Sequence, residues 1–392
     1  MPHVPNSDGA AMIGGSVSVR PVNGKSDLKH FIELPKRLYR GQAGYVAPLD
    51  IERAETLDPA KNPYFAHAEV QLFLAWRDNK PVGRISAQIC RLYQERYQDA
   101  TGHFGFIDAI DDQAVYRALT STAEDWLRQR GMKRIVGPLS FSTNEETGLL
   151  IDGFDSLPML MMPYHARYAG ARLEGCDYGK TKDVIAYDVD KESYKAVGSS
   201  RLIDKILADG RVRVRPLDMK HYRRDLALAL DIFNDAWSEN WGMIPFTQAE
   251  IEAAAAGLKP LIDPKLVAIA EVDGEAAGML VCVPNLLEAV RDLNGALLPF
   301  GWIKLIWRLK VGRLKTARVP LMGIRKKHHG SLLGATLVPL MFGAIKEHFL
   351  ARGLERVELS WILEDNMPMR RVCEGVGARA YKTYRVYEKA LT

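Results

Sequence analysis

No stretch of the 392-residue sequence approaches the roughly 18 consecutive apolar residues that a membrane-spanning helix needs, which excludes a segment that crosses a bilayer. The four cysteines are far apart, the nearest pair being Cys90 and Cys176, so they form neither a Cys-x-x-Cys metal pair nor a dense disulfide framework. Residues 1–16 lack the basic-then-apolar pattern of a secretion signal and predict a flexible extension. These absences favour a reducing, cytoplasmic location, and we expect no metal site.

The composition is that of an ordinary globular protein. Apolar residues make up 47% and charged residues 26% of the chain, which excludes a disordered chain, a coiled coil and a collagen-like rod. At ~150 residues per domain, the length predicts two to three domains. The net charge of +5 is unevenly spread, because residues 304–327 carry nine Lys and Arg and no Asp or Glu. One strongly basic segment therefore lies on an otherwise mildly acidic body.

Four features recur in the same order about 200 residues further along the chain. They are the alternating runs Val17–Val22 and Val212–Leu217, the hairpin-like pairs around Asp78-Asn79 and Asp273-Gly274, the segments 128–135 and 350–357, and the Glu-Gly pairs at 174–175 and 374–375. In the third pair a helical stretch ends at Gly131 or Gly353 and a β-rich run follows, which is typical of a glycine C-cap. The recurrence predicts two copies of one α/β domain.

We place the two copies at residues 17–195 and 211–392. Each is expected to run strand, helices, hairpin, strand, helix, strand, helix and paired terminal strands. Hairpins within this order favour the α+β arrangement, a mixed and mostly antiparallel sheet flanked by helices, over a doubly wound parallel sheet.

The second copy contains a predicted anion site. Ala317–Ile324 predicts a strand and 332–351 a helix with apolar residues at helical spacing, and a basic turn lies between them. Free backbone N–H groups and the helix dipole face a ligand at such a helix start, and the lysines add charge. The expected binding residues are Ile324, Arg325, Lys326, Lys327, His329, Gly330 and Ser331.

This order of elements resembles the acyl-CoA-binding half of a GNAT (Gcn5-related N-acetyltransferase) fold. In that family an Arg/Gln-x-x-Gly-x-Gly/Ala turn binds the coenzyme A pyrophosphate; here Gly330 matches and Leu332 replaces the second small residue. The family's later pattern of Asn, Ala, Tyr and Gly falls on Asn366, Met369, Cys373 and Gly377, of which Asn366 and Gly377 fit. The resemblance implies that Asn366 belongs to the acyl-CoA site. Cys373 stands where many members carry the tyrosine that protonates the leaving thiolate.

Over residues 17–390 the sequence resembles a bacterial family of tandem GNAT-like proteins that includes the bacterial ceramide synthases. Phrases that carry the resemblance are Gly153-Phe154-Asp155, Met161-Met162-Pro163-Tyr164 and the run from Glu358 to Asn366. The resemblance implies transfer of a long-chain fatty acyl group from acyl-CoA, the donor substrate, to the amine of a sphingoid base, with no bound cofactor. The corresponding turn of the first copy, 105–112, is acidic and would repel a pyrophosphate. We expect Asp112 to cap a helix there, and the first copy to shape the acceptor pocket.

A basic amphipathic insertion, 292–316, precedes the predicted anion site. Leu298, Trp302, Leu305, Ile306 and Leu309 share one helical face, and Lys304, Arg308 and Lys310 lie elsewhere. This pattern favours a helix that lies in a membrane interface, so we expect residues 296–318 to contact an anionic membrane at the inner face of the bacterial inner membrane. The alternative is an insertion that packs on the body with a solvated basic face. No recognised motif accompanies the charge, and we expect no nucleic-acid partner.

Direct N-acyl transfer needs a base for the amine, donors for the oxyanion and an acid for the thiolate. The candidate bases are Glu145 and Glu146, in the polar turn 142–147, and His328; a capping role for the glutamates is an open alternative. Cys373 and Tyr384 are the candidate acids. A covalent enzyme intermediate is disfavoured, since no Gly-x-Ser-x-Gly elbow is present. Two further functions stay open: a GNAT acetyltransferase for a small soluble amine or a protein lysine, and a non-catalytic acyl-CoA-binding module.

Overall fold

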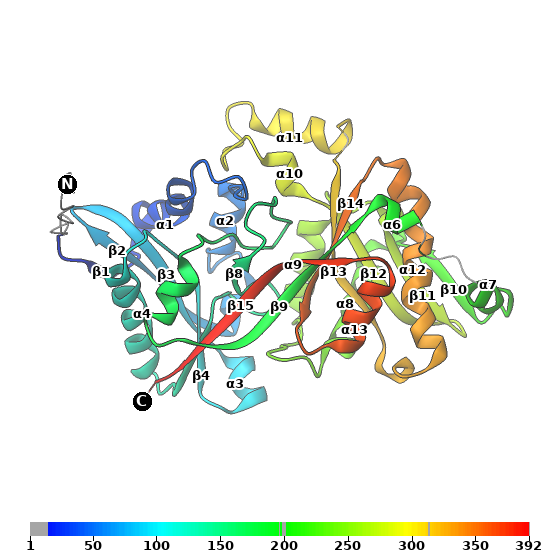
Figure 1. Ribbon diagram of the computed structural model, residues 1–392, viewed down its shortest axis with the longest axis horizontal. Coiled ribbons are helices and arrows are strands. Elements are labelled where there is room, and N and C mark those ends of the chain that lie inside the picture. Colours follow the sequence, from blue (N-terminus) through cyan, green and yellow to red (C-terminus); the bar gives the residue numbers. More distant parts are fainter. Residues whose placement is uncertain (1–14, 196, 198–200, 313, 392) are drawn as a thin grey trace, which may run out of the picture.

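The computed structural model describes residues 15–195, 197, 201–312 and 314–391 (Figure 1). All but two residues of the extension predicted at 1–16 lie outside this part of the chain, as does Arg313 of the basic insertion.

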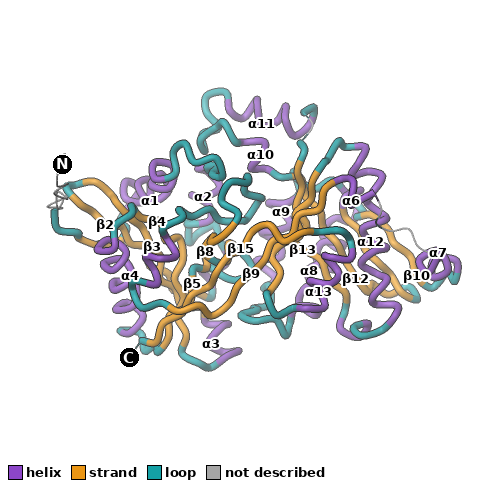
Figure 2. The backbone as a smooth tube through the Cα atoms, viewed as in Figure 1, coloured by secondary structure: helices purple, strands orange, loops and turns teal. Residues whose placement is uncertain are grey.

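A single twisted sheet of thirteen strands runs through the part of the chain that the structure describes (Figure 2). Neighbouring strands are antiparallel except for two parallel pairs, β4 with β5 and β13 with β14, so the predicted mixed, mostly antiparallel sheet is confirmed. In sheet order the strands are β1 (Ser18–Pro21), β2 (Ala68–Arg77), β3 (Lys80–Cys90), β4 (Thr101–Ala109), β5 (Arg134–Gly137), β15 (Arg379–Ala390), β9 (Gly179–Asp190), β14 (Arg356–Leu363), β13 (Thr316–Ile324), β12 (Glu275–Pro284), β11 (Val267–Val272) and β10 (Val212–Pro216); β8 (Leu149–Asp152) pairs with β15. The short strands β6 (Leu139–Ser140) and β7 (Glu146–Thr147) form a separate pair.

Helices cover both faces of this sheet (Figure 1). They are α1 (Gly24–Leu38), α2 (Asp50–Thr56), α3 (Arg91–Tyr97), α4 (Gln113–Arg128), α5 (Ala169–Glu174), α6 (Lys191–Lys195), α7 (Arg201–Ala208), α8 (Tyr222–Trp237), α9 (Gln248–Leu258), α10 (Leu286–Val290), α11 (Gly301–Lys310), α12 (Leu332–Ala351) and α13 (Met367–Gly375). Alternate residues of a strand point to opposite faces. Accordingly Leu280 and Cys282 of β12 pack in the core with α12, whereas Met279 and Val281 pack in the core with α8.

The local signals in the sequence gave the elements of both halves. The hairpin turns at Asp78-Asn79 and Asp273-Gly274 have positive φ at both central residues, the geometry that suits the twist of flanking antiparallel strands. Gly131 and Gly353 follow α4 and α12 with φ of +80° and +76°, as a left-handed C-cap requires. Asp112 caps α4 by accepting a hydrogen bond from the Ala114 N–H at 2.7 Å, which confirms the predicted cap.

The terminal strands are paired across the two halves, and the expectation that they pair within each half is wrong. β9, the last strand of the first half, lies between β15 and β14 of the second half. β15, at the end of the chain, pairs with both β5 and β8 of the first half. Sequence patterns define a strand but not its neighbour, and here the open edge of each half is filled by the other half's last strand.

We predict that neither half folds alone. A fragment of residues 17–195 and a fragment of residues 211–392, each expressed separately, should show no cooperative thermal unfolding by circular dichroism, because each leaves a long sheet edge unpaired. The control is the full chain with a protease site inserted in the exposed turn at Asp209-Gly210, which after cleavage should stay assembled and unfold cooperatively. Cooperative unfolding of either isolated fragment would contradict the prediction.

Candidate active site

The predicted anion-binding turn lies between β13 and α12, and acidic side chains neutralise its cations. Arg325 pairs with Asp231, Lys326 with Glu239, and Lys327 with Glu275. The partners come from α8, the segment after it and the first residue of β12, all distant in sequence, so no local pattern indicated them. These pairs are partly or largely exposed, so water screens them and each contributes little to stability. The turn therefore presents less free positive charge than its sequence predicted.

Two glycines shape the backbone of this turn. Gly330 has a φ of +69°, which favours glycine, and a Cβ there would meet open space. A Cβ on Gly334 would lie 2.0 Å from the His328 carbonyl oxygen, so the close approach of the turn to α12 requires glycine at 334. Ser331 caps α12 by accepting from the Gly334 N–H at 2.9 Å. Leu332 and Leu333, in the first turn of the helix, have N–H groups without an intrahelical acceptor, available to an anion. The sequence prediction used Gly330 and missed Gly334.

The two histidines of the turn have different surroundings. His329 Nε2 donates to the Ile324 carbonyl at 2.9 Å, which ties the turn to the end of β13. His328 Nε2 is buried without a partner among the described residues, and burial together with the Lys327 charge lowers the pKa of this imidazole. His328 lines neither the slot nor the cavities described below.

Beside the turn, β13 and β14 diverge. Their parallel pairing ends at Val319 and Leu359, and beyond this point a narrow slot opens between them. Asn366 lines the slot and caps α13, accepting from the Met369 N–H at 3.2 Å. Asn366 is thus in a position to contact a ligand that enters between the strands.

Beside the slot, an apolar cavity of about 440 Å³ lies between the two halves. Trp237, Pro320 and Trp361 line both spaces. Most of the wall is hydrophobic: it includes Leu49, Leu160, Met161, Leu230, Phe233, Phe246, Leu258, Leu261, Leu286 and Leu321. The volume and character are those of a site for a sizeable apolar ligand.

Glu145 lies on the wall of this apolar cavity. The polar turn that carries it is bound to the second half, since Thr143 Oγ1 donates to the Gly242 carbonyl at 2.9 Å and Asn144 Nδ2 to the Ile244 carbonyl at 2.8 Å. Glu145 Oε2 accepts from the Phe141 N–H at 3.3 Å, and no Lys or Arg forms an ion pair with it among the described residues. Burial, with the negative charges of neighbouring glutamates, raises the pKa of Glu145 to about 8. A carboxyl with such a pKa is suited to proton transfer near neutral pH.

Glu146, the next residue, lines a different space. Its carboxylate pairs with the Arg53 guanidinium of α2, and both groups line a smaller, polar cavity in the first half. The same wall carries the Lys36–Asp50 pair and a buried group in which Arg84 Nε donates to Asp108 Oδ2 at 2.8 Å. Glu52, Leu160 and Met161 line the polar and the apolar cavity together. The slot, the apolar cavity and the polar cavity are therefore neighbours, and each shares wall residues with the next.

A buried polar network on the wall of the apolar cavity was missed by the sequence analysis. Arg318 is 3% exposed; its Nε donates to Ser360 Oγ at 2.8 Å and its Nη1 to the Leu160 carbonyl at 2.6 Å. Ser360 and Tyr381 hydroxyls both donate to Glu358. Burial lowers the pKa of Arg318, despite the nearby Glu358 carboxylate. The sequence signal that could have indicated this network is the presence of polar residues inside runs that otherwise predict buried strands.

The position of Arg318 contradicts part of the predicted membrane surface, which we placed at residues 296–318. Because its side chain is buried between the halves, it cannot reach a membrane. The surface must end before β13.

Cys373 and Tyr384 are not brought to these cavities. Cys373 is fully buried on the core side of α13, and burial raises the pKa of its thiol to about 12. Tyr384 is fully buried, its hydroxyl has no partner in the described part of the chain, and burial raises its pKa. Neither residue lines the slot or the two cavities, so the geometry gives no support to either as the acid.

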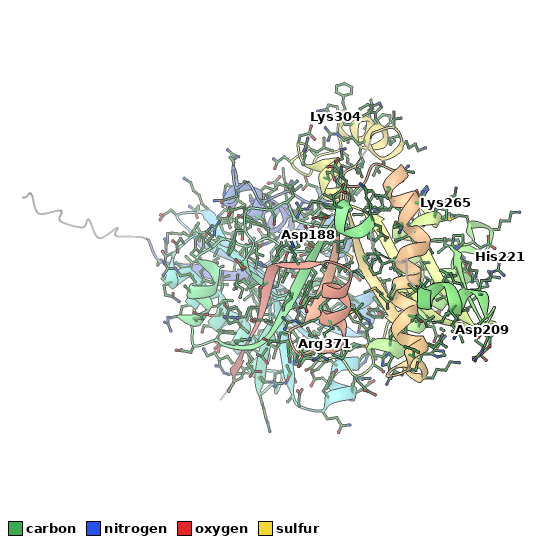
Figure 3. All side chains as sticks on the ribbon, turned by 45° about the vertical axis from the view of Figure 1, so that its right-hand side comes forward. Asp188, Asp209, His221, Lys265, Lys304 and Arg371 are labelled. Carbon is green, nitrogen blue, oxygen red and sulfur yellow. The ribbon has the colours of Figure 1, made fainter. Side chains whose placement is uncertain are left out.

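The basic insertion forms α11, which projects from the body beside the largely buried helix α10; Lys304 marks α11 in Figure 3. Leu305 and Leu309 pack inward against the core, whereas the outer surface exposes large apolar side chains: Leu298, Phe300, Trp302, Ile303, Ile306, Trp307 and Val311. The single apolar face predicted for the helix is thus divided between the core and solvent. Lys304 and Arg308 share Asp292 as ion-pair partner. Among the described residues, no helix is long and apolar enough to cross a membrane.

Comparisons with known proteins place this site in a family. No model of a described protein family matches the chain. Bacterial ceramide synthase of Caulobacter vibrioides is 48% identical over 376 residues, which is 96% of this chain and 98% of that protein. Protein YghO of Escherichia coli is 41% identical over 381 residues, 97% of each chain.

Two solved structures have folds similar to that of this chain. A tandem GNAT protein from the clavulanic acid biosynthesis pathway has a TM-score of 0.57 at 12% identity and covers 96% of this chain and 99% of its own. A GCN5-related N-acetyltransferase from Sphaerobacter thermophilus has a TM-score of 0.52 at 13% identity and covers 96% of both chains. The chain therefore belongs to the tandem GNAT-like bacterial family that includes the bacterial ceramide synthases, and it is an N-acyltransferase.

Proposed function

We propose that the protein transfers a long-chain fatty acyl group from acyl-CoA to the amine of a sphingoid base. The observation that carries this proposal is the apolar cavity of about 440 Å³, which adjoins the slot between β13 and β14 and has Glu145 on its wall. An acetyl group would leave such a cavity empty, whereas a long alkyl chain buries its methylenes there, at ~0.8 kcal/mol for each.

In this proposal the second half binds the donor. The diphosphate of acyl-CoA lies on the turn 324–331, against the N–H groups at the start of α12, with Arg325, Lys326, Lys327 and His329 around it. The thioester arm follows the slot past Asn366. The first half supplies the acceptor side through its polar cavity, and its own equivalent helix start is occupied by the Asp112 carboxylate, which would repel a second diphosphate.

The chemical step is direct transfer. Glu145 accepts a proton from the acceptor's ammonium group, and the neutral amine attacks the thioester carbonyl. The C–N bond forms and an oxyanion develops; as the C–S bond breaks, the nitrogen releases its second proton, which passes through solvent to the departing coenzyme A thiolate. Arg318 contributes positive charge to the cavity in which the oxyanion develops. The Arg53–Glu146 pair holds α2 and β7 together at the acceptor side.

The exposed apolar surface of α11 completes the proposal. Long-chain amines partition into membranes, and monomeric soluble proteins rarely expose an apolar patch of this kind. The patch carries two tryptophans, Trp302 and Trp307, and Lys304 and Lys310 lie beside it, a composition that suits an anionic membrane interface. The helix α10, which supports α11, contributes Leu286 to the apolar cavity and Leu287 to the polar cavity, so the surface and the site are adjacent.

Chain selectivity tests the proposed function. Purified protein with sphinganine should release coenzyme A and form an amide from palmitoyl-CoA at least ~100-fold faster than from acetyl-CoA. Ala254→Trp, which fills part of the apolar cavity, should shift the preference to shorter acyl chains, whereas Ala256→Trp on the solvent face of the same helix should not. Turnover of acetyl-CoA with soluble amines, or no turnover at all, would contradict the proposal and favour a small-amine acetyltransferase or a binding module respectively.

The pH dependence tests Glu145. Its folded-state pKa of about 8 lies above the ordinary value, so the basic form becomes populated only as the pH rises through 8, and kcat/KM should rise up to that pH and then level off. Glu145→Gln should lower kcat by ~10²–10⁴-fold and remove this rise. Glu252→Gln, an exposed position on α9, is the control and should leave both unchanged. An unaltered profile in Glu145→Gln would exclude Glu145 as the base.

Vesicle binding tests the membrane surface. Trp302→Glu with Trp307→Glu should weaken binding to vesicles that contain phosphatidylglycerol by at least ~10-fold in a flotation assay, because each change removes an interfacial aromatic group and adds a repelled charge. The control is Leu207→Glu, which changes an exposed leucine on α7. Equal binding by the double variant and the control would show that α11 is not the docking surface.

A further inference from the structure

A buried histidine faces the polar cavity of the first half. His165 lies between β8 and α5, is 6% exposed, and lines the cavity with Glu146 and Tyr45. The backbone N–H of Leu150 donates to His165 Nδ1 at 3.1 Å. This hydrogen bond anchors the ring and fixes which of its nitrogens accepts.

The anchor determines the proton position on the ring. A neutral imidazole carries one proton, and because Nδ1 accepts from Leu150, that proton is on Nε2. Burial lowers the pKa of His165, so the neutral form holds at physiological pH even though Asp108 and Glu146 are near. No described residue accepts a hydrogen bond from Nε2. The cavity wall therefore presents a fixed N–H donor whose acceptor must come from a ligand or solvent.

The other charged groups of this cavity are mostly paired with one another. Arg84 binds Asp108, Lys36 pairs with Asp50, and Arg53 with Glu146. Three polar groups remain open: the Glu52 carboxylate, which forms no ion pair among the described residues, and the Tyr45 and Tyr164 hydroxyls, for which the described chain offers no hydrogen-bond partner. Glu52 also lines the apolar cavity, on whose wall Glu145 lies.

The unpaired polar groups of this cavity indicate which chemical groups a ligand must carry to pair with them. Carboxylates at the junction of the two cavities suit an amine, but an amine alone does not satisfy the His165 donor, which needs a neighbouring acceptor oxygen. A hydroxyl group supplies that oxygen and also donates in return, which suits a wall of mixed donors and acceptors.

We propose that the polar cavity recognises a hydroxyl group on the carbon next to the amine-bearing carbon of the acceptor, through a hydrogen bond from His165 Nε2–H. The acceptor is then an amino alcohol whose amine lies toward Glu52 and Glu145. This inference rests on the proposed function and names the residue that selects the head of the acceptor. His165 is a specificity-determining residue, and the reacting atoms do not touch it.

The effect on selectivity follows from the buried donor. A site built to bind a hydroxyl rejects an analogue that lacks it, because the buried group is then left unpaired. The wild-type protein should therefore show a kcat/KM for sphinganine at least ~10–100-fold above that for octadecylamine, which has the chain and the amine but no hydroxyl. Sphinganine without its terminal hydroxyl (1-deoxysphinganine) identifies which of the two hydroxyls is bound.

Two substitutions separate recognition from folding. In His165→Asn the shorter side-chain amide retains an acceptor near the Leu150 N–H but cannot reach the position of Nε2. In His165→Gln the longer side chain places an N–H donor near the position of Nε2. We expect His165→Asn to reduce the sphinganine-to-octadecylamine ratio to within ~3-fold of unity and His165→Gln to retain part of it. His348→Asn, a change at a half-exposed histidine that pairs with Asp263, is the matched control.

The readout is the ratio of kcat/KM values with palmitoyl-CoA as donor, together with the thermal unfolding midpoint of each variant. A ratio in His165→Asn equal to that of the wild-type protein overturns this inference and leaves the proposed function standing. Failure of the wild-type protein to acylate either amine overturns both. Loss of the ratio in His165→Asn with part of it retained in His165→Gln, at unchanged unfolding midpoints, supports recognition by an N–H donor at the position of Nε2.

Discussion

The exchange of the last strands, β9 and β15, is the constraint on which the rest of the structure depends. Each strand completes the sheet of the other half, so the two halves cannot separate without breaking a continuous ladder of backbone hydrogen bonds. The cavities form at the joint that this exchange fixes. Side chains from distant parts of the chain, such as those of Glu145 and Arg318, consequently face the same space without a flexible linker between them.

The buried charges of the site carry a desolvation cost. Glu145 and Arg318 lie in largely apolar surroundings, where ionised forms are disfavoured, and their pKa values shift in opposite directions for that reason. Arg318 keeps its proton through hydrogen bonds to a serine and to main-chain carbonyls, whereas Glu145 has a single weak main-chain donor. Arg318 is thus stabilised in its protonated form, whereas Glu145 can take up or release a proton near neutral pH. Such a pair of environments is typical of catalytic sites.

The sequence indicated the local elements and the family but not the way in which distant residues meet. The turn from β13 to α12 and the duplicated hairpins were predictable because glycine, alternation and helical spacing are local signals. Glu145 could be named as a candidate, but its burial depends on contacts of Thr143 and Asn144 with residues about 100 positions away. His165 carries no local signature, and Arg318 carries only that of a polar residue inside a run that otherwise predicts a buried strand. Their significance comes from the cavity that they line, and no pattern in one dimension describes a cavity.

The acidic partners of the basic turn have a consequence for ligand discrimination. The carboxylates of Asp231, Glu239 and Glu275 already form ion pairs with the cations of the turn, so an anionic ligand must compete with them. A single inorganic phosphate gains little by displacing one of them, because it can replace one contact only. A nucleotide thioester that also reaches along the divergent strands replaces several at once. In the proposed function, the turn would thereby favour a multivalent ligand over the abundant simple anions of a cell.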